Sequence, residues 1–310
     1  MRKLLILSEC GQNVPHLTDG FEVVALPQNA DADLRLREIA DAQVVIGEPS
    51  LAELKVAKHL KWVQMTWAGA DRYLHGGFPK DVLLTTASGA FGETIAEHAL
   101  AMLFSLCRRL PAYQKAGKWQ DLGCEKRITG STALIFGCGN IGTEIAKRLQ
   151  ALGIQTIGVC RSARQPRAHF EALTTLPCAA AFLPEADFIL CALPSNSETE
   201  QYFDERRLSM CKDNAVLINV GRGSLIDLKG LTNLINSGKF FGGGLDVTES
   251  EPLPPEHALW KMPNVIITPH VAGVSFGHLP ETEEKIWAIC RENLQCYLDG
   301  KPLRNQVILP

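Results

Sequence analysis

One arginine in the second half of the sequence stands where a ligand is expected to bind. Arg222 follows the apolar run Val216–Asn219 and has a glycine on each side, Gly221 and Gly223. The carboxyl ends of strands in a doubly wound sheet face the ligand crevice, and glycines let a ligand approach the backbone. A planar guanidinium matches a carboxylate with a keto oxygen beside it. We therefore predict that Arg222 binds an anionic carbonyl compound, although a structural arginine at a strand end is the alternative.

A glutamate and a histidine follow the next two predicted strands. Glu251 comes shortly after Gly244–Val247 and precedes Pro252, which disfavours a helical backbone at Glu251. His270 comes directly after the strand Val265–Thr268 and its proline. A carboxylate beside an imidazole stabilises the imidazolium, so that the ring serves as a proton donor at neutral pH. A histidine taken alone is more often structural, but three complementary strand-end groups in one α/β domain favour a catalytic site.

A glycine-rich turn predicts a dinucleotide site. Gly137–Gly142 reads G-x-G-x-x-G and lies between the apolar strand Ala133–Phe136 and the helical pattern Ile141–Leu152, which is the context that this motif requires. Its glycines permit a tight turn, close approach of a pyrophosphate and close packing of helix on strand. An ordinary glycine-rich turn is the alternative. The predicted cofactor contacts in this turn are Gly137, Gly139, Asn140, Ile141 and Gly142.

The end of the following strand bears on the choice of cofactor. An NAD site normally has an acidic residue there to accept hydrogen bonds from the ribose hydroxyls. After Gln155–Val159 this sequence has Cys160, Arg161 and Ser162, and no carboxylate. An arginine pairs well with a 2′-phosphate. We predict NADP(H) as the preferred cofactor, held in part by Arg161 and Ser162, with NAD(H) as the alternative; a solvated surface arginine would give no preference.

Short apolar runs alternate with helical patterns along nearly the whole chain, and this alternation predicts βαβ units with parallel sheets. The first series of predicted strands is Leu4–Leu7, Val23–Leu26, Val44–Ile46 and Trp62–Met65. The second is Ala133–Phe136, Thr156–Val159, Phe188–Cys191, Val216–Asn219, Gly244–Val247 and Val265–Thr268. The predicted fold class is therefore α/β, with two doubly wound parallel-sheet domains.

Two long helices are predicted at Glu93–Leu110 and Glu281–Leu298. Pro111 is expected to end the first of them or to follow its end. The first helix carries an apolar stripe, which either packs within the chain or contributes to a dimer. Its members are Ile95, Ala96, Ala99, Leu100, Leu103 and Leu106.

Composition excludes several classes of protein. The chain has 310 residues, 46% of them hydrophobic, and a formal net charge of -3, which gives no reason to expect nucleic acid as a partner. The apolar run Leu4–Leu7 is too short for a signal peptide, and no run approaches the roughly 18 residues of a membrane span. The ten cysteines form no C-x-x-C pair and no cluster with zinc-ligand spacing. We predict a cytoplasmic protein with reduced cysteines, no metal site and no membrane contact.

Taken together, these motifs resemble the D-2-hydroxyacid dehydrogenase family, and the resemblance covers nearly the whole chain. It rests on Gly137–Gly142, Val220–Gly223, Asp246–Pro252 and Thr268–Gly273, and it extends to Trp67–Asp71 and Thr94–Glu97. The chain has no ribose-binding acid, and in this respect it is similar to the short glyoxylate and hydroxypyruvate reductases that use NADPH. The rival class is a corepressor-like protein that keeps the fold and binds the nucleotide without turnover.

The resemblance implies a role for each group. Arg222 would bind and polarise a small 2-keto acid, His270 would be the acid/base, and Glu251 would tune His270. Backbone amides around Ala68 and Gly69 would hold the substrate carboxylate. Asp246 would contact the nicotinamide carboxamide, and further cofactor contacts would come from Thr94, Leu193, Pro194, Val220 and Gly273.

The same resemblance implies a particular domain order. The substrate domain would be discontinuous, with residues 1–97 and 284–310, and the dinucleotide-binding domain would be the inserted segment 98–283. The reactive groups would face a cleft that closes on the substrate. A homodimer formed through the cofactor domain is also expected. Five residues are candidates to line the substrate pocket, with the hydrophobic core as the alternative for each: Trp67, Tyr73, Phe91, Trp260 and His278.

Overall fold

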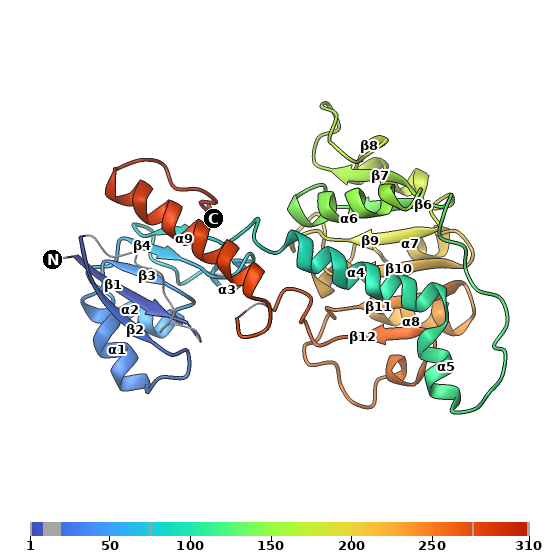
Figure 1. Ribbon diagram of the computed structural model, residues 1–310, viewed down its shortest axis with the longest axis horizontal. Coiled ribbons are helices and arrows are strands. Elements are labelled where there is room, and N and C mark those ends of the chain that lie inside the picture. Colours follow the sequence, from blue (N-terminus) through green and yellow to red (C-terminus); the bar gives the residue numbers. More distant parts are fainter. Residues whose placement is uncertain (1, 9–19, 75, 275, 309–310) are drawn as a thin grey trace. The chain divides into compact units, whose positions relative to one another are not determined.

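The computed structural model describes residues 2–8, 20–74, 76–274 and 276–308. The chain divides into two compact units (Figure 1): Met1–Phe91 with Val274–Pro310, and Gly92–Gly273 between them in the sequence. We call them the outer unit and the inserted unit. The boundaries lie at 91/92 and 273/274, whereas the sequence prediction put them at 97/98 and 283/284. The first differs because the helix that begins at Gly92 belongs as a whole to the inserted unit.

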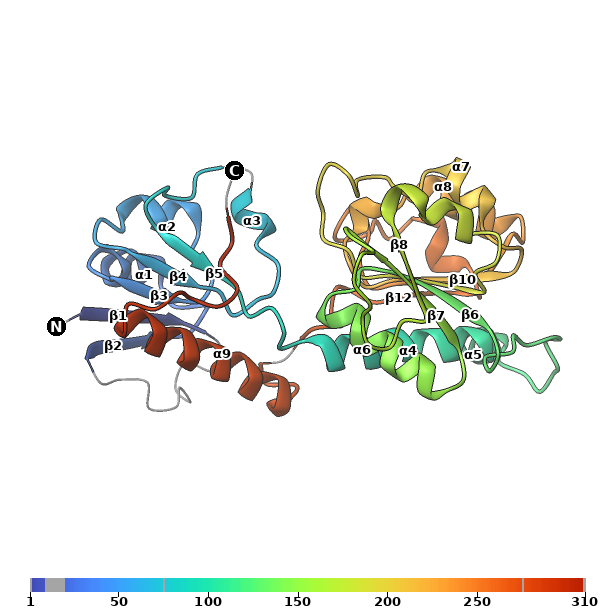
Figure 2. The same ribbon diagram turned by 90° about the horizontal axis from the view of Figure 1, so that it is seen from above.

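The outer unit contains a five-stranded parallel sheet in the order β2-β1-β3-β4-β5. Its strands are β1 Arg2–Leu7, β2 Phe21–Leu26, β3 Val44–Ile46, β4 Trp62–Gln64 and β5 Leu83–Thr85. Figure 2 shows α9 on one side of this sheet and α1 and α2 on the other. The helices are α1 Ala32–Ala40, α2 Leu51–Val56, α3 Asp71–Leu74 and α9 Pro280–Leu298. Both faces of the central strands are therefore buried, which explains the continuous apolar run at Leu4–Leu7.

The inserted unit contains a seven-stranded parallel sheet in the order β12-β11-β10-β9-β6-β7-β8. Its strands are β6 Thr132–Phe136, β7 Gln155–Cys160, β8 Ala172–Thr175, β9 Phe188–Cys191, β10 Ala215–Asn219, β11 Phe240–Leu245 and β12 Val265–Ile267. The strand order reverses between β6 and β9, and ligands of doubly wound sheets bind at such a reversal.

Helices cover both faces of this second sheet. Figure 2 shows α4 and α6 on one side and α7 and α8 on the other. The α-helices are α4 Gly92–Cys107, α5 Leu110–Ala116, α6 Asn140–Ala151, α7 Glu205–Met210 and α8 Leu228–Asn236. Short 3₁₀ turns are η2 Leu176–Phe182, η3 Gly223–Leu225 and η4 Ala258–Lys261. The predicted α/β class with two doubly wound parallel sheets is confirmed.

The helix predicted at Glu93–Leu110 ends earlier than expected. α4 stops at Cys107, the backbone turns through the left-handed region at Arg109 (φ 52°), and α5 then begins. Pro111 follows the end of α4 and lies in the first turn of α5, where a backbone N–H is not needed. The apolar stripe of α4 is buried within the chain, where the helix packs on β10, β11 and α6.

The strand predicted at Gly244–Val247 begins four residues earlier and ends two residues earlier, as β11. Glycines at 242, 243 and 244 disguise it, because they lower the apolar and β-forming character of the sequence. They are needed for packing: a Cβ added at Gly242 would lie 3.1 Å from Leu106 of α4, and one at Gly244 would lie 2.7 Å from Ile218. The strands β5 and β8 were also missed, since each is short and partly polar.

The nine cysteines among the described residues are free thiols, and Cys10 lies outside these residues. No helix in the described part of the chain combines the length and the apolar character needed to cross a membrane.

Candidate active site

The carboxyl ends of β6, β9, β10 and β11 bring four loops together at one edge of the inserted unit. Glycines reveal how closely the loops approach. A Cβ added at Gly137 would lie 2.7 Å from the carbonyl oxygen of Ala192, and one at Gly221 would lie 2.7 Å from that of Leu193. A Cβ at Gly223 would overlap the backbone of Thr248. Only glycine fits these positions, so the loops that carry the predicted site form one packed surface.

The glycine-rich turn has the geometry of a pyrophosphate site. Gly137 has a φ of 106°, which favours glycine, and a Cβ at Gly142 would collide with the carbonyl group of Gly137. A Cβ at Gly139 meets nothing within 4 Å, so the space beside this backbone is open. α6 begins at Asn140 and has no side-chain cap, which leaves its first N–H groups for an anion. The Asn140 side chain faces Gly92 of α4.

The end of β7 is basic. Arg161 and Ser162 are exposed directly after the strand, and no carboxylate stands with them. The structure adds a residue that the sequence reasoning missed: Arg167 donates from Nη1 to the carbonyl oxygen of Cys138, at 2.8 Å. That bond brings the Arg167 guanidinium to the glycine-rich turn. Its spacing from Arg161 and Arg164 is the sequence feature that would have drawn attention to it.

The predicted glutamate and histidine are in direct contact. His270 Nδ1 lies 2.8 Å from Glu251 Oε2, and both side chains are close to half exposed. The other carboxylate oxygen, Oε1, accepts from the backbone N–H of Thr248 at 3.2 Å. His270 has a left-handed backbone (φ 56°), held by its N–H bond to the carbonyl oxygen of Asp246 at 2.8 Å. The ring is therefore oriented both by its contact with Glu251 and by the backbone bond to Asp246.

Asp246 organises the loop that carries His270. Its carboxylate is 2% exposed and accepts from Thr268 Oγ1 at 2.6 Å and from the N–H groups of Val271 and Ala272 at 2.9 and 3.0 Å. His98 of α4 joins this network through Nε2, 3.0 Å from Thr268 Oγ1. The sequence reasoning missed His98, because a helical residue 170 positions away gives no local indication of the contact.

Arg222 is held by its own turn. Its Nη1 donates to the carbonyl oxygen of Gly221 at 2.8 Å, and the side chain is half-buried. Asn219, which is fully buried, accepts from the N–H of Gly221 at 3.0 Å and donates to the carbonyl oxygen of Arg222 at 3.0 Å. The sequence reasoning did not single out Asn219. A polar residue that closes an otherwise apolar strand was the available indication.

The other predicted cofactor residues lie in different settings. Val220 is buried and donates its N–H to the carbonyl oxygen of Cys191 at 3.0 Å. Leu193 is half-buried and Pro194 is exposed, in the loop after β9. Thr94 lies in the first turn of α4, and Gly273 is the last residue of the inserted unit.

The residues predicted to hold the substrate carboxylate are in the outer unit. Ala68 is exposed and Gly69 half-buried, in the loop between β4 and α3. Among the described residues neither of their N–H groups donates to a protein acceptor. Of the aromatic candidates, Tyr73 and Phe91 are buried, so the core alternative holds for them. Trp67 and Trp260 are 48% and 43% exposed, and His278 is exposed.

In the part of the chain that the structure describes, no group of three or more His, Cys, Asp or Glu side chains is placed to hold a metal ion.

Comparison with known proteins decides the family. The model of the "D-isomer specific 2-hydroxyacid dehydrogenase, NAD binding domain" family matches residues 100–272. The chain belongs to this family. It is therefore an oxidoreductase that acts on a CH–OH group, and the predicted resemblance is confirmed.

Similar proteins support the same assignment for this dehydrogenase. Human "Glyoxylate reductase/hydroxypyruvate reductase" is 33% identical over 250 residues, which are 77% of this chain and 71% of the human one. The solved structure of a D-isomer specific 2-hydroxyacid dehydrogenase family protein from Aeromonas salmonicida is 33% identical, has a TM-score of 0.87 and covers 99% of both chains. An NADPH-dependent glyoxylate/hydroxypyruvate reductase from Sinorhizobium meliloti, solved with NADP and sulfate, is 27% identical, with a TM-score of 0.82 and coverage of 99% and 98%.

Proposed function

We propose that this dehydrogenase reduces a small 2-keto acid of the glyoxylate or hydroxypyruvate type to a D-2-hydroxy acid. The observation that carries the proposal is the bond between His270 Nδ1 and Glu251 Oε2, on the loops that follow β12 and β11. Arg222 lies on the turn after the adjacent strand β10. A proton donor and a carboxylate-binding guanidinium are what reduction of a 2-keto acid requires from the protein.

The bond to Glu251 assigns the two ring nitrogens of His270 to different tasks. Nδ1 is occupied by the carboxylate, so Nε2 is the atom that exchanges a proton with the substrate oxygen. In reduction, Nε2 of the imidazolium protonates the oxygen that develops negative charge. In oxidation, the neutral ring accepts that proton back. The Glu251 carboxylate stabilises the charged form of the ring in both directions.

Arg222 polarises the substrate. A guanidinium beside a 2-keto acid donates to the keto oxygen and to the carboxylate together, which a point charge does not reproduce. Asn219 keeps the turn of Arg222 fixed, so the guanidinium needs little reorganisation as charge develops. We also propose that the N–H groups of Ala68 and Gly69 hold the substrate carboxylate.

The glycine-rich turn and the first turn of α6 fit a dinucleotide, and we propose NADP(H) as the preferred cofactor with NAD(H) as a second choice. When bound, the reduced nicotinamide supplies the hydride for the carbonyl carbon. Exposed Arg161 and Ser162 at the end of β7 suit a 2′-phosphate, and Arg167 adds positive charge beside the same turn. We assign Asp246 to the nicotinamide end of the site, because it fixes the loop of His270.

The partners that we propose are the small acid and a second copy of the chain, in the cytoplasm. The net charge of -3 gives no basis for nucleic acid.

The test is a screen of glyoxylate, hydroxypyruvate, pyruvate and 2-ketobutyrate against NADPH and NADH. We expect the highest kcat/KM for glyoxylate or hydroxypyruvate with NADPH, followed as loss of NADPH absorbance. Tight NADPH binding without turnover of any of the four acids would instead support a nucleotide-binding protein of the corepressor type.

A further inference from the structure

A buried carboxylate that the proposed chemistry does not use lies in the outer unit. Glu48 is 8% exposed and comes two residues after the end of β3. Because β3 and β4 pair in parallel, with Ile46 opposite Gln64, the loops that follow the two strands lie side by side. The N–H of Gly47 donates to the carbonyl oxygen of Gln64 at 2.8 Å and fixes this arrangement.

The Glu48 side chain ties these two loops together. Its Oε1 accepts from the N–H of Thr66 at 2.8 Å, from the N–H of Trp67 at 3.2 Å and from the hydroxyl of Thr66 at 3.0 Å. Burial raises the pKa of this carboxyl, and the donors of Thr66 and Trp67 oppose the rise. A desolvated carboxylate is costly unless such donors compensate it, so its place in the fold calls for an explanation.

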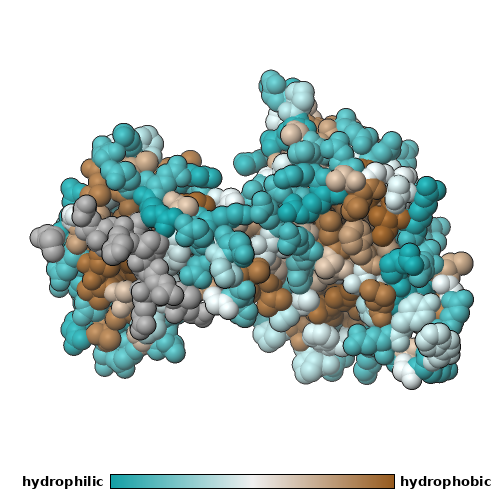
Figure 3. Space-filling model, viewed as in Figure 1, coloured by the Kyte–Doolittle hydropathy of each residue, from teal (hydrophilic) through white to brown (hydrophobic). Residues whose placement is uncertain are grey.

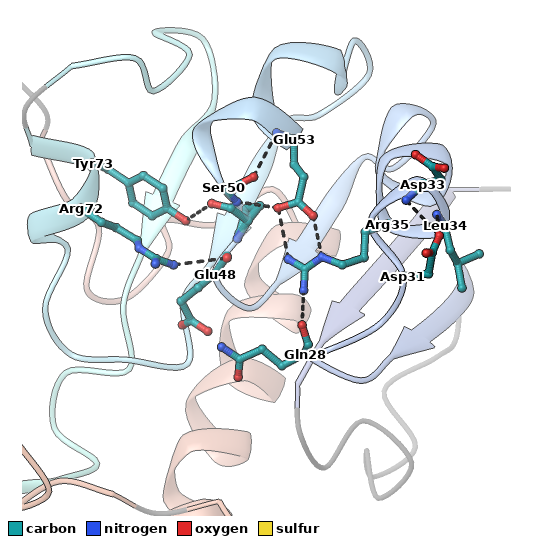
Figure 4. Close-up of polar contacts among 11 residues, drawn as sticks. Gln28, Asp31, Asp33, Leu34, Arg35, Glu48, Ser50, Glu53, Arg72 and Tyr73 are labelled. Carbon is teal, nitrogen blue, oxygen red and sulfur yellow. Dashed lines mark hydrogen bonds and ion pairs between the residues drawn. The ribbon is translucent and has the colours of Figure 1, made fainter.

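Arg72 and Tyr73 of α3 reinforce the same connection. Figure 4 shows both side chains reaching to the segment that begins at Glu48. Arg72 Nη1 lies 3.3 Å from the carbonyl oxygen of Glu48, and its guanidinium lies 5.4 Å from the ring centre of Trp67. The Tyr73 hydroxyl donates to the carbonyl oxygen of Pro49 at 2.7 Å. The Thr66–Trp67 segment is thus held from the side chain of Glu48 and through Arg72.

We propose that Glu48 is a positioning residue for substrate binding: it fixes Thr66 and Trp67, and thereby the direction of the next two N–H groups, those of Ala68 and Gly69. This inference rests on the proposed function, in which those two N–H groups bind the substrate carboxylate. Preorganised N–H groups bind an anion better than mobile ones, because less conformational entropy is lost on binding. Glu48 contacts no reacting atom in this scheme.

Two substitutions separate the hydrogen bonds from the charge. Glu48→Gln retains an oxygen where Oε1 accepts from both backbone N–H groups, so it should hold the loop. Glu48→Met fills a similar volume and accepts nothing, which leaves both N–H groups without their partner. Glu48→Asp keeps the charge but is one methylene too short to reach the two N–H groups. It tests the loss of these hydrogen bonds if Glu48→Met does not fold.

The readouts are KM and kcat for the best 2-keto acid, together with the affinity of the NADPH-bound enzyme for oxalate measured by calorimetry. For Glu48→Met we expect KM to rise and oxalate affinity to fall by about tenfold or more, with kcat and NADPH affinity within about twofold. Glu48→Gln should bind oxalate as well as the wild type does. This split would not result from a general loss of stability, which would affect NADPH binding and kcat as well.

Glu53 supplies the matched control. It is also a buried glutamate of the outer unit, but it accepts from Arg35 and from the N–H of Ser50 at the start of α2 (Figure 4). Glu53→Met should lower the thermal midpoint and leave KM and oxalate affinity unchanged.

The outcomes distinguish the two proposals. Oxalate binding that depends on Glu48, in an enzyme that reduces no 2-keto acid, would remove the proposed function and keep the role of Glu48. Turnover with an unchanged KM in Glu48→Met would remove the role of Glu48 and keep the function. The role of Glu48 would also be overturned if Glu48→Gln and Glu48→Met lost oxalate affinity equally, or if the wild type did not bind oxalate.

Discussion

At the scale of single residues, the contact between Glu251 and His270 determines which ring nitrogen is available. The carboxylate accepts a hydrogen bond from Nδ1 and another from the N–H of Thr248, so the pair is oriented before any substrate arrives. Oriented groups of this kind reduce the reorganisation needed in the transition state. The consequence is that the rate of reduction should depend on the charge of Glu251.

Glu251→Gln should lower kcat/KM for the 2-keto acid. Reduction needs a proton donor at His270, and the carboxylate charge stabilises the ring that carries this proton, which an amide does not do. NADPH affinity should be retained. The exposed neighbour Glu249 provides the control, since Glu249→Gln should leave kcat/KM unchanged. An unchanged kcat/KM in Glu251→Gln would show that Glu251 does not tune His270.

Arg161→Asp should change the cofactor preference. A charge-assisted bond from Arg161 to a 2′-phosphate is worth about 1.5–3 kcal/mol, which corresponds to roughly a 10- to 150-fold preference of the wild type for NADPH. The aspartate would repel that phosphate and accept from a ribose hydroxyl, so kcat/KM should swing towards NADH. The measurement is kcat/KM with both cofactors. Equal use of both by the wild type would mean that Arg161 stacks on the adenine or stays in solvent.

At the scale of elements, two glycines of one turn should behave differently. A Cβ at Gly142 would collide with the backbone of Gly137, so Gly142→Ala should push α6 away from β6 and lower the free energy of unfolding by about 1–3 kcal/mol or more. A Cβ at Gly139 meets no protein atom within 4 Å. Gly139→Ala should therefore keep its thermal midpoint and lose NADPH affinity. Unchanged NADPH affinity in Gly139→Ala would argue against a pyrophosphate beside this turn.

Sequence patterns predicted the elements whose apolar character is continuous and failed where packing depends on distant residues. The strand β1 is apolar because both faces of its sheet are covered, and that pattern is visible locally. The bounds of β11 were misplaced because its glycines 242 and 244 carry no strand signal of their own, and the reason for them is the close packing of Met102 and Leu106 of α4. The end of α4 likewise depends on a left-handed residue, Arg109, for which arginine gives no indication.

The candidate site was predictable as a set of strand-end residues, and the structure brings Glu251 and His270 together. Their supporting residues were not predicted. His98 reaches Thr268 from another helix, which no local pattern indicates, and the indication for Asn219 was a single polar residue at the end of an apolar strand. Glu48 gives no indication in the sequence, because its role depends on which loops the parallel pairing of β3 and β4 places side by side.

At the scale of the whole molecule, we expect a dimer formed through the inserted unit. The buried stripe of α4 no longer supports this expectation, since it packs within the chain. Surface features do: Leu110 is 55% exposed and Trp119 fully exposed, and Figure 3 shows apolar side chains on the face of the inserted unit where α4 lies. Sedimentation should give a dimer at micromolar concentration, weakened by Trp119→Ser. A monomer of the wild type would reject the expectation.

The most direct test of the proposed reaction is the kcat/KM for hydroxypyruvate of His270→Ala and Arg222→Ala. Both should fall by about a hundredfold or more while NADPH affinity is retained, and the wild-type product should be the D-hydroxy acid. Arg222→Lys should also have a strongly reduced kcat/KM, because an ammonium group cannot replace the planar guanidinium. Arg206, an exposed arginine of α7, is the control, and Arg206→Ala should keep its activity. Near-normal kcat/KM in either alanine variant would contradict the assigned chemistry.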